Sequence, residues 1–416
     1  MNKLYNALVR VTEKLLPLPA AFSPKMKQFV EGRKETFSIL KEKIQPKDKV
    51  IWFHAASLGE FEQGVPIIEI VKKIYPDHKI VVSFFSPSGY ENKKNTPLAN
   101  AVVYLPLDTP ANAQAFIDQV HPDLALFIKY EFWPNYLQVL KDRNIRTLLI
   151  SGAFRKDQVF FKSYGSWMKR SLETFEHFFV QNEQSRELLK TIGFKNVTVS
   201  GDTRFDRVAR QPQIDNSLDF IEAFLGGKTC IVAGSTWPED EKLLLDFINE
   251  SPEEVKFIIA PHQINREKIE GFRKKINRPV ILFSEKEKGK LSESKVLIID
   301  TIGLLTRIYS YGNIAYVGGA AGDTGLHNIL EPAAFGIPIV IGKNFQKFPE
   351  AKLLQNMGGL FSVDSGKELQ EIFNRLLKDE AFRKRSGLIA GQFIRENTGA
   401  GSIVETYLSA SNVKNP

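Results

Sequence analysis

The chain has 416 residues, of which 43% are hydrophobic and 25% are charged, and its formal net charge is +8. This length exceeds one ordinary hydrophobic core, so we expect two or three domains in a soluble protein. The single cysteine, Cys230, excludes an intrachain disulfide and any cluster of cysteine ligands, and we expect it to be an inert core thiol. The positive charge suits an anionic partner, but no zinc-finger spacing and no aromatic-glycine RNA signature accompanies it, so we expect no nucleic acid.

The first twenty residues have the pattern of a basic amphipathic helix. At about 100° per residue, one face gathers apolar side chains and one flank gathers cations. The apolar residues are Leu4, Leu8, Val11 and Leu15, and the cations are Lys3, Arg10 and Lys14. Pro17 and Pro19 are expected to end the helix. Such a helix either lies in the interface of an anionic membrane or packs on its own domain, and the sequence leaves both readings open.

Other membrane signals are lacking in the sequence. No uncharged apolar run reaches about 18 residues, so we expect no transmembrane span. No small-residue cleavage site follows an apolar core, so we expect no secretory signal. A membrane contact would therefore be peripheral or monotopic.

Strands and helices alternate along the rest of the chain. In the first half we expect strands at 50–54, 80–85, 101–105, 124–128, 147–151, 178–180 and 197–200, with helices such as 60–74 and 134–143 between them. In the second half we expect strands at 230–233, 257–260, 280–283, 296–299, 314–317 and 337–341. This alternation predicts an α/β fold with parallel sheets covered on both faces.

A stretch of mixed polarity interrupts the alternation near the middle of the chain. We therefore predict an N-terminal helix at 1–20, a Rossmann-like domain at 21–205, an interdomain connection at 206–228 and a second Rossmann-like domain at 229–416. Two such domains with an interdomain cleft make the architecture called GT-B.

The stretch from Gly312 to Lys343 reads as a strand, a glycine-rich loop at 318–325, a helix that starts near Asn328 and a second strand. This is a βαβ unit whose loop stands at the carboxyl end of a strand, where open α/β sheets bind ligands. Glycines let backbone N–H groups approach an anion, a helix N-terminus adds partial positive charge, and Glu331 can accept hydrogen bonds from ribose hydroxyls. We interpret the stretch as a nucleotide-sugar site. The alternative is a tight turn in an α/β domain without a ligand.

A second informative segment, IWFHAASLGE, ends at Glu60. A strand ends near His54, small residues make a close turn, and Glu60 opens the next helix. A carboxylate at this place can act as a general base. The helix dipole lowers the basicity of such a group, and acidic residues often stand there only to complement the helix N-terminus, which is the alternative.

Several longer motifs occur together in this chain. They are HAASLGE at 54–60, SPSGYE at 86–91, YEFWPN at 130–135, SGDTRFD at 200–206 and HNILEPAAFGIP at 327–338, between EGRK at Glu31 and the late segment ENTGAGS. In this order and spacing the chain resembles the 3-deoxy-D-manno-octulosonic acid (Kdo) transferases, which attach Kdo to the lipid A precursor in Gram-negative bacteria. The resemblance covers most of the chain, whereas GT-B glycosyltransferases in general share only the pattern around 331–338.

The resemblance implies a function and a set of roles. The N-terminal domain would bind the lipid A precursor (lipid IVA) and the C-terminal domain CMP-Kdo, at the cytoplasmic face of the inner membrane, in lipopolysaccharide core biosynthesis. Glu60 would deprotonate the acceptor hydroxyl, which attacks the anomeric carbon with inversion and releases CMP. Arg204, in the family's basic motif position, would meet an anionic group. No cofactor is implied and no metal is required, and the six histidines show no metal-binding spacing.

The family's remaining site positions are partly matched and partly changed. Of two acids in the family's E-x-E-x-W-P-N motif, this chain has Lys129 and keeps Glu131. The family's Pro-Arg pair corresponds to Pro261 and His262, which replaces a permanent charge with a titratable one. The Met-Gly-Glu element corresponds to Ile302, Gly303 and Leu304, and the last CMP-binding element matches at Asn328, Ile329, Leu330 and Glu331.

Two other functions stay open at this stage. One is another GT-B enzyme, such as a UDP-sugar transferase or epimerase. The other is a non-catalytic, membrane-associated nucleotide-binding protein, against which Glu60 argues.

Overall fold

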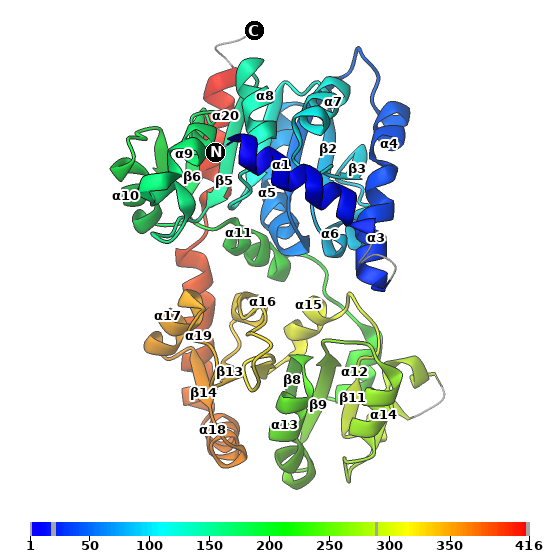
Figure 1. The fold of residues 1–416 in the computed structure, drawn as a ribbon. Coiled ribbons are helices and arrows are strands. Elements are labelled where there is room, and N and C mark those ends of the chain that lie inside the picture. Colours follow the sequence, from blue (N-terminus) through cyan, green and yellow to red (C-terminus); the bar gives the residue numbers. More distant parts are fainter. Residues whose placement is uncertain (1, 18–21, 288–289, 413–416) are drawn as a thin grey trace. The chain divides into compact units, whose positions relative to one another are not determined.

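The computed structural model describes residues 2–17, 22–287 and 290–412. It contains two compact units (Figure 1). Unit 1 comprises the chain up to Arg207 and again from Thr398 onward, and unit 2 comprises Val208–Asn397. Each unit has its own parallel sheet of seven strands. The prediction of an α/β protein with two Rossmann-like domains is confirmed.

The sheet of unit 1 has the strand order β3-β2-β1-β4-β5-β6-β7. Its strands are β1 Lys49–Ala55, β2 His78–Phe84, β3 Ala101–Tyr104, β4 Leu124–Ile128, β5 Arg146–Gly152, β6 His177–Val180 and β7 Val197–Val199. Along β1, Val50 and Trp52 pack in one hydrophobic cluster and Ile51 and Phe53 in the other, because successive side chains of a strand point to opposite faces. Both faces are therefore buried, as parallel sheets require.

Helices cover the two faces of this sheet. They are α1 Asn2–Leu15, α3 Pro24–Lys34, α4 Thr36–Lys43, α5 Leu58–Ile74, α6 Pro87–Lys93, α7 Pro110–Val120, α8 Pro134–Asp142, α9 Ser166–Leu172, α10 Glu183–Thr191, α11 Thr203–Arg210 and α20 Ala400–Asn412. Helix α1 ends two residues before Pro17, and Pro19 lies outside the described residues. None of the described helices combines the length and apolarity needed to span a bilayer.

The sheet of unit 2 has the strand order β10-β11-β9-β8-β12-β13-β14. Its strands are β8 Thr229–Thr236, β9 Val255–Pro261, β10 Val280–Leu282, β11 Val296–Ile298, β12 Ile314–Val317, β13 Ile339–Gly342 and β14 Leu360–Val363. Its helices are α12 Asp219–Leu225, α13 Pro238–Glu250, α14 Arg266–Arg273, α15 Leu305–Ile308, α16 Leu330–Ala334, α17 Pro349–Met357, α18 Gly366–Lys378 and α19 Glu380–Glu396. Cys230 is buried in this core, where burial raises the pKa of its thiol.

The predicted domain boundaries need correction at both ends of unit 2. The expected connection at 206–228 contains the end of α11 and all of α12. The end of the chain does not belong to the second domain, because α20 packs in unit 1, where Val404 and Leu408 enter the same hydrophobic cluster as Ile70 of α5 (Figure 1). An apolar stripe on a helix indicates burial but not the sheet that it covers.

Asp206 joins the two segments at which the chain leaves and re-enters unit 1. Its Oδ1 accepts the backbone N–H of Gly399 at 3.0 Å and that of Gly401 at 3.3 Å. Gly399 has a φ of +113°, a conformation that glycine adopts without strain. The motifs SGDTRFD and ENTGAGS, about 190 residues apart in sequence, therefore meet in space.

Candidate functional site

The candidate residues of unit 1 lie where the strand order reverses. Strands β1 and β4 are neighbours, and the chain builds the sheet outward from them in opposite directions. Ligands of open α/β sheets bind at such a switch point, beyond the carboxyl ends of the strands. The loop after β1 carries HAASLGE, and the loop after β4 carries KYEFWPN. The structure thus brings the two loops to one edge of the sheet.

Glu60 stands in the first turn of α5, as predicted. The helix has Ser57 as its N-cap, and the Ser57 hydroxyl donates a hydrogen bond to Glu60 Oε2 instead of accepting one from the helix backbone. The carboxylate is half-buried. Ser57 therefore holds one oxygen of the Glu60 carboxylate in place.

Glu131 is held by Trp133 and a buried histidine. Trp133 Nε1 lies 3.0 Å from Glu131 Oε2 and 3.0 Å from His54 Nε2, so one indole N–H points at both acceptors. His54 is fully buried, and its Nδ1 lies 2.8 Å from Ser83 Oγ, which also accepts the indole N–H of Trp52. Trp133 also packs by its ring, on which Phe85 stacks at 4.7 Å, so this side chain has both a polar and an apolar role.

Lys129 directly follows β4 and lies in the left-handed region, with a φ of +73°. Its Nζ lies 4.9 Å from the ring centre of Tyr130, and Arg155 Cζ lies 5.5 Å from the same ring centre. Non-glycine residues with this φ are uncommon and cluster at functional sites. Two cations therefore lie near the ring of Tyr130, and one of them, Lys129, stands where the family pattern has an acid.

Arg204 forms a bidentate pair with Asp202, with Nε and Nη2 each 2.8 Å from Oδ2. Asp202 Oδ1 in turn accepts the side-chain amide of Gln63, one turn beyond Glu60 on α5, at 3.0 Å. Thr203 Oγ1 donates to the carbonyl of Gln63 at 2.6 Å. The SGDTRFD motif is thus tied to the helix that carries Glu60. Sequence reasoning missed Asp202 and Gln63, although the first lies inside the motif.

In unit 2 three aromatic rings gather after β8, β9 and β12. His262 stacks on Trp237 at 4.8 Å and on His327 at 4.2 Å, and Trp237 Nε1 donates to His327 Nε2 at 2.9 Å. Burial lowers the pKa of His262. Burial, together with the charge of His262, lowers the pKa of His327 to about 4. Both imidazoles are therefore neutral near pH 7, and the Pro261–His262 corner brings no permanent charge.

Asp240 organises the glycine-rich loop after β12. Its carboxylate accepts the N–H groups of Trp237 and Gly319 at 2.9 and 2.8 Å and the hydroxyl of Tyr316 at 2.8 Å. A Cβ at Gly318 would lie 2.3 Å from the carbonyl oxygen of Ser235, so only glycine fits between these loops. Asp240 was not predicted. The sequence indicates it only weakly, as an acid in the first turn of a helix that begins with proline.

Glu331 connects the two remaining predicted elements. Its Oε2 accepts the hydroxyl of Thr306 at 2.9 Å, and its Oε1 accepts the side-chain amide of Asn328 at 3.1 Å. Thr306 lies in α15, directly after the exposed Ile302, Gly303 with a φ of +90°, and Leu304. Ile329 and Leu330 are buried and hold this turn in place.

The helix expected to start near Asn328 begins at Leu330 and is short. Helix α16 has only five residues, because Gly336 turns the chain with a φ of +69° soon after it. So short a helix adds little dipole, and any anion here must be bound by the loop backbone and by side chains.

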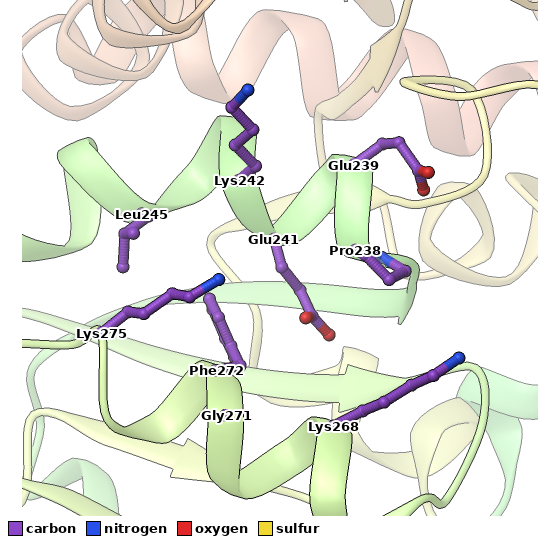
Figure 2. Close-up of a pocket in the computed structure, with 9 residues that line it drawn as sticks. All are labelled: Pro238, Glu239, Glu241, Lys242, Leu245, Lys268, Gly271, Phe272 and Lys275. Atoms are coloured by element: carbon purple, nitrogen blue, oxygen red, sulfur yellow. The ribbon is translucent and has the colours of Figure 1, made fainter.

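A cavity of about 530 Å³ lies elsewhere in unit 2, between α13 and α14 (Figure 2). Glu241 points into it between Lys268 and Lys275, whereas Lys242 points away. Burial raises the pKa of Glu241. No predicted site residue lines this cavity, so it is separate from the strand-end groups described above.

Within the described ranges, no cluster of three His, Cys, Asp or Glu side chains is arranged to hold a metal ion. The predicted residues form two groups, one at the carboxyl edge of each sheet. Glu60, Lys129, Glu131 and Arg204 lie in unit 1, and the other predicted residues lie in unit 2.

Comparison with known proteins gives this arrangement a context. Residues 31–207 match the sequence model of the 3-deoxy-D-manno-octulosonic-acid transferase (kdotransferase) family. The chain is 28% identical to the 3-deoxy-D-manno-octulosonic acid transferase of Haemophilus influenzae, over 85% of each protein. It is 26% identical to a bifunctional glycosyltransferase/methyltransferase of Fusobacterium nucleatum, over 94% of this chain but only 63% of that longer protein.

Among solved structures, the UDP-GlcNAc 2-epimerase of Neisseria meningitidis bound to UDP-GlcNAc is similar in fold. The TM-score is 0.62 over 86% of this chain and 99% of that one, at 14% sequence identity. At this identity the likeness shows a shared fold alone. By this family match over residues 31–207, by these relatives and by the motifs that the fold brings together, the chain resembles the 3-deoxy-D-manno-octulosonic acid (Kdo) transferases.

Proposed function

We propose that this protein transfers Kdo from CMP-Kdo to the lipid A precursor lipid IVA in lipopolysaccharide core biosynthesis, with inversion and with Glu60 as the general base. The observation that carries the proposal is the place of Glu60. Its carboxylate stands at the switch point of unit 1, in the motif where the family has its proton acceptor, with one oxygen held by Ser57.

In this mechanism Glu60 accepts the proton of a glucosamine hydroxyl. The hydroxyl oxygen forms a bond to the anomeric carbon of Kdo from the side opposite to CMP. The bond from that carbon to the phosphate oxygen breaks, and CMP leaves with the electron pair. Attack from the opposite side inverts the anomeric centre. A positioned base contributes about 10²- to 10⁴-fold to such a rate.

The neighbours of Glu60 have distinct roles in the proposal. Glu131, held by the Trp133 N–H, stabilises positive charge that develops on the sugar. Lys129, whose Nζ lies over the face of the Tyr130 ring, meets the Kdo carboxylate or a phosphate. Arg204 acts through Asp202 and Gln63, which fix the start of α5.

We propose that unit 2 binds the CMP moiety at the edge formed by Pro261, His262 and the glycine-rich loop. Backbone N–H groups of that loop and of the turn at 302–304 face the phosphate. Glu331 binds the ribose, because a carboxylate accepts hydrogen bonds from hydroxyls and Thr306 and Asn328 hold this one in place. The nucleotide preference separates this function from a UDP-sugar enzyme. CMP should raise the thermal midpoint of the protein, and an equal effect of UDP would favour the alternative.

Helix α1 supports a peripheral site on the cytoplasmic face of the inner membrane. Leu4, Leu8, Val11 and Leu15 are each more than half exposed and form one stripe, flanked by the cations at positions 3, 10 and 14. This pattern suits the interface of an anionic bilayer. Deleting the residues before Pro17 should weaken binding to anionic vesicles and leave CMP binding intact. Unchanged vesicle binding would contradict this part of the proposal.

A direct assay tests the whole proposal. Purified protein, CMP-Kdo and lipid IVA in vesicles should give a product whose mass exceeds that of the acceptor by one or more Kdo residues. Absence of any transfer, with CMP still bound, would favour a non-catalytic nucleotide-binding protein.

A further inference from the structure

Helix α1 presents its polar face, and not its apolar face, to the body of unit 1. Tyr5 Oη donates to Asp108 Oδ2 at 2.8 Å, and the side-chain amide of Asn135 donates to Asn6 Oδ1 at 2.9 Å. Further along the helix, Glu13 accepts the side-chain amide of Asn112 at 2.7 Å. A surface helix of a soluble protein normally packs by its apolar stripe. Here the polar contacts hold the helix and the apolar stripe faces outward.

The acceptor of the Tyr5 hydroxyl is also the anchor of α8. Asp108 is 1% exposed, and its two oxygens accept the backbone N–H groups of Asn135 and Tyr136, each at 3.1 Å. These are groups of the first turn of α8, which have no partner within the helix. One buried carboxylate therefore binds both α1 and the start of α8.

The segment just before α8 carries the candidate acceptor-site residues. Glu131 and Trp133 lie two to four residues before Asn135, and Trp133 is the N-cap of α8. A shift of α1 relative to Asp108 or Asn135 is thus a shift relative to the loop that carries Glu131.

The link between α1 and the loop that carries Glu131 matters because the proposed acceptor is amphiphilic. Its acyl chains stay in the bilayer, so only its sugar head reaches the protein, and the depth of the protein decides whether the head meets Glu60 and Glu131. A hydrogen bond to a buried carboxylate resists sliding better than an apolar contact, because its geometry is directional.

We propose that Tyr5, Asn6 and Asp108 form a joint that sets the depth of the acceptor-site loop, residues 129–133, relative to the membrane surface on which α1 lies. These three are positioning residues, and Tyr5 acts through Asp108. The inference rests on the proposed transfer to a membrane-bound acceptor. It adds how the chain sets the position of its site relative to that acceptor.

The variant Tyr5→Phe tests the joint, because it keeps the ring near Trp167 and removes only the hydroxyl. Turnover on acceptor in phosphatidylethanolamine–phosphatidylglycerol vesicles should fall by about three- to tenfold more than turnover on a deacylated acceptor in solution, with unchanged vesicle binding. The matched control is Tyr164→Phe, an exposed tyrosine of the same unit, which should show no such difference. Equal effects of Tyr5→Phe on both acceptors, or no effect on either, would overturn the joint.

A second readout does not depend on catalysis. Vesicles should slow hydrogen exchange in peptides that contain the Asn135 and Tyr136 amides of the wild type, and Tyr5→Phe should remove this effect. If the wild type transfers no Kdo but shows this protection, the proposed function fails and the joint stands. If transfer occurs and the amides do not respond to vesicles, the joint is wrong and the function stands.

Discussion

Trp133 and Trp237 make the same kind of contact in the two units. Each is the N-cap of a helix that begins with proline, and each donates its indole N–H to Nε2 of a histidine, at 3.0 Å in unit 1 and 2.9 Å in unit 2. The accepting nitrogen must be unprotonated in both pairs. The two rings therefore fix one strand-end loop in each unit by the same chemistry.

The Trp133→Phe variant should lower turnover by about tenfold and leave CMP-Kdo affinity unchanged, because it removes the hydrogen bond to Glu131 and keeps the stacking on Phe85. Trp237→Phe is the matched variant in unit 2, and it should raise the donor KM with a smaller effect on turnover. Steady-state kinetics with each substrate varied will check this. The same pattern in both variants would show that the tryptophans serve folding alone.

Glu60→Gln should reduce turnover by about 10²- to 10⁴-fold with donor affinity nearly unchanged, since the amide cannot accept a proton. A glutamate that only complements the helix N-terminus would instead cost roughly 1 kcal/mol of stability or less. Kdo transfer and CMP-Kdo binding should be measured on the folded variant. Turnover above about a tenth of the wild-type value would end this assignment and make Glu131 the next candidate.

Glu331→Ala should raise the KM for CMP-Kdo more than the KM for the acceptor. The variant removes the proposed ribose contact and also leaves Thr306 and Asn328 without their acceptor. Thr306→Val is the control, because it breaks the same internal bond and keeps the carboxylate. An equal rise in both KM values would indicate a folding defect.

Acid should destabilise unit 2 through His327. Its pKa is about 4 in the folded protein, lowered mainly by burial, and near 6.5 in an unfolded chain. The unfolded state therefore binds more protons between these values, so the free energy of unfolding falls as the pH drops from about 6.5 to about 4. His327→Gln should make the thermal midpoint less dependent on pH in this window. An unchanged pH dependence would show that other groups cause it.

Asp240→Asn should lower the free energy of unfolding by about 1 to 3 kcal/mol, because an amide nitrogen cannot accept the N–H groups that Asp240 now accepts. Asp246→Asn, on the same helix, is the control. Denaturant titration measures both variants, and equal stabilities would mean that the loop finds other acceptors.

Local patterns were sufficient for much of the fold. Leu124–Ile128 and Ile314–Val317 are strands with the predicted bounds, because buried parallel strands are short runs of β-branched and aromatic residues. The place of Glu60 after the first strand also followed from spacing. Strand β14 was missed, since Ser362 interrupts its short apolar run and only the two end residues, Leu360 and Val363, are buried.

The partners of the site residues were beyond local patterns. Trp237 and His327 are 90 residues apart in the sequence, and Gly319 and Asp240 are 79 residues apart. Neither hydrogen bond can therefore be recognised from a local pattern of residues. A tryptophan before a proline reads only as a helix start. Tertiary packing decides which carboxylate accepts the N–H groups of the surrounding loops.

The return of α20 to unit 1 has a consequence for synthesis on the ribosome. Val404 and Leu408 complete a hydrophobic cluster whose other members were made hundreds of residues earlier. Unit 1 therefore stays incomplete while the whole of unit 2 is translated, and the late Gly399 and Gly401 amides reach Asp206 only at the end. A nascent chain stalled near Asn397 therefore leaves this apolar surface of unit 1 open to chaperones and proteases until α20 has been made.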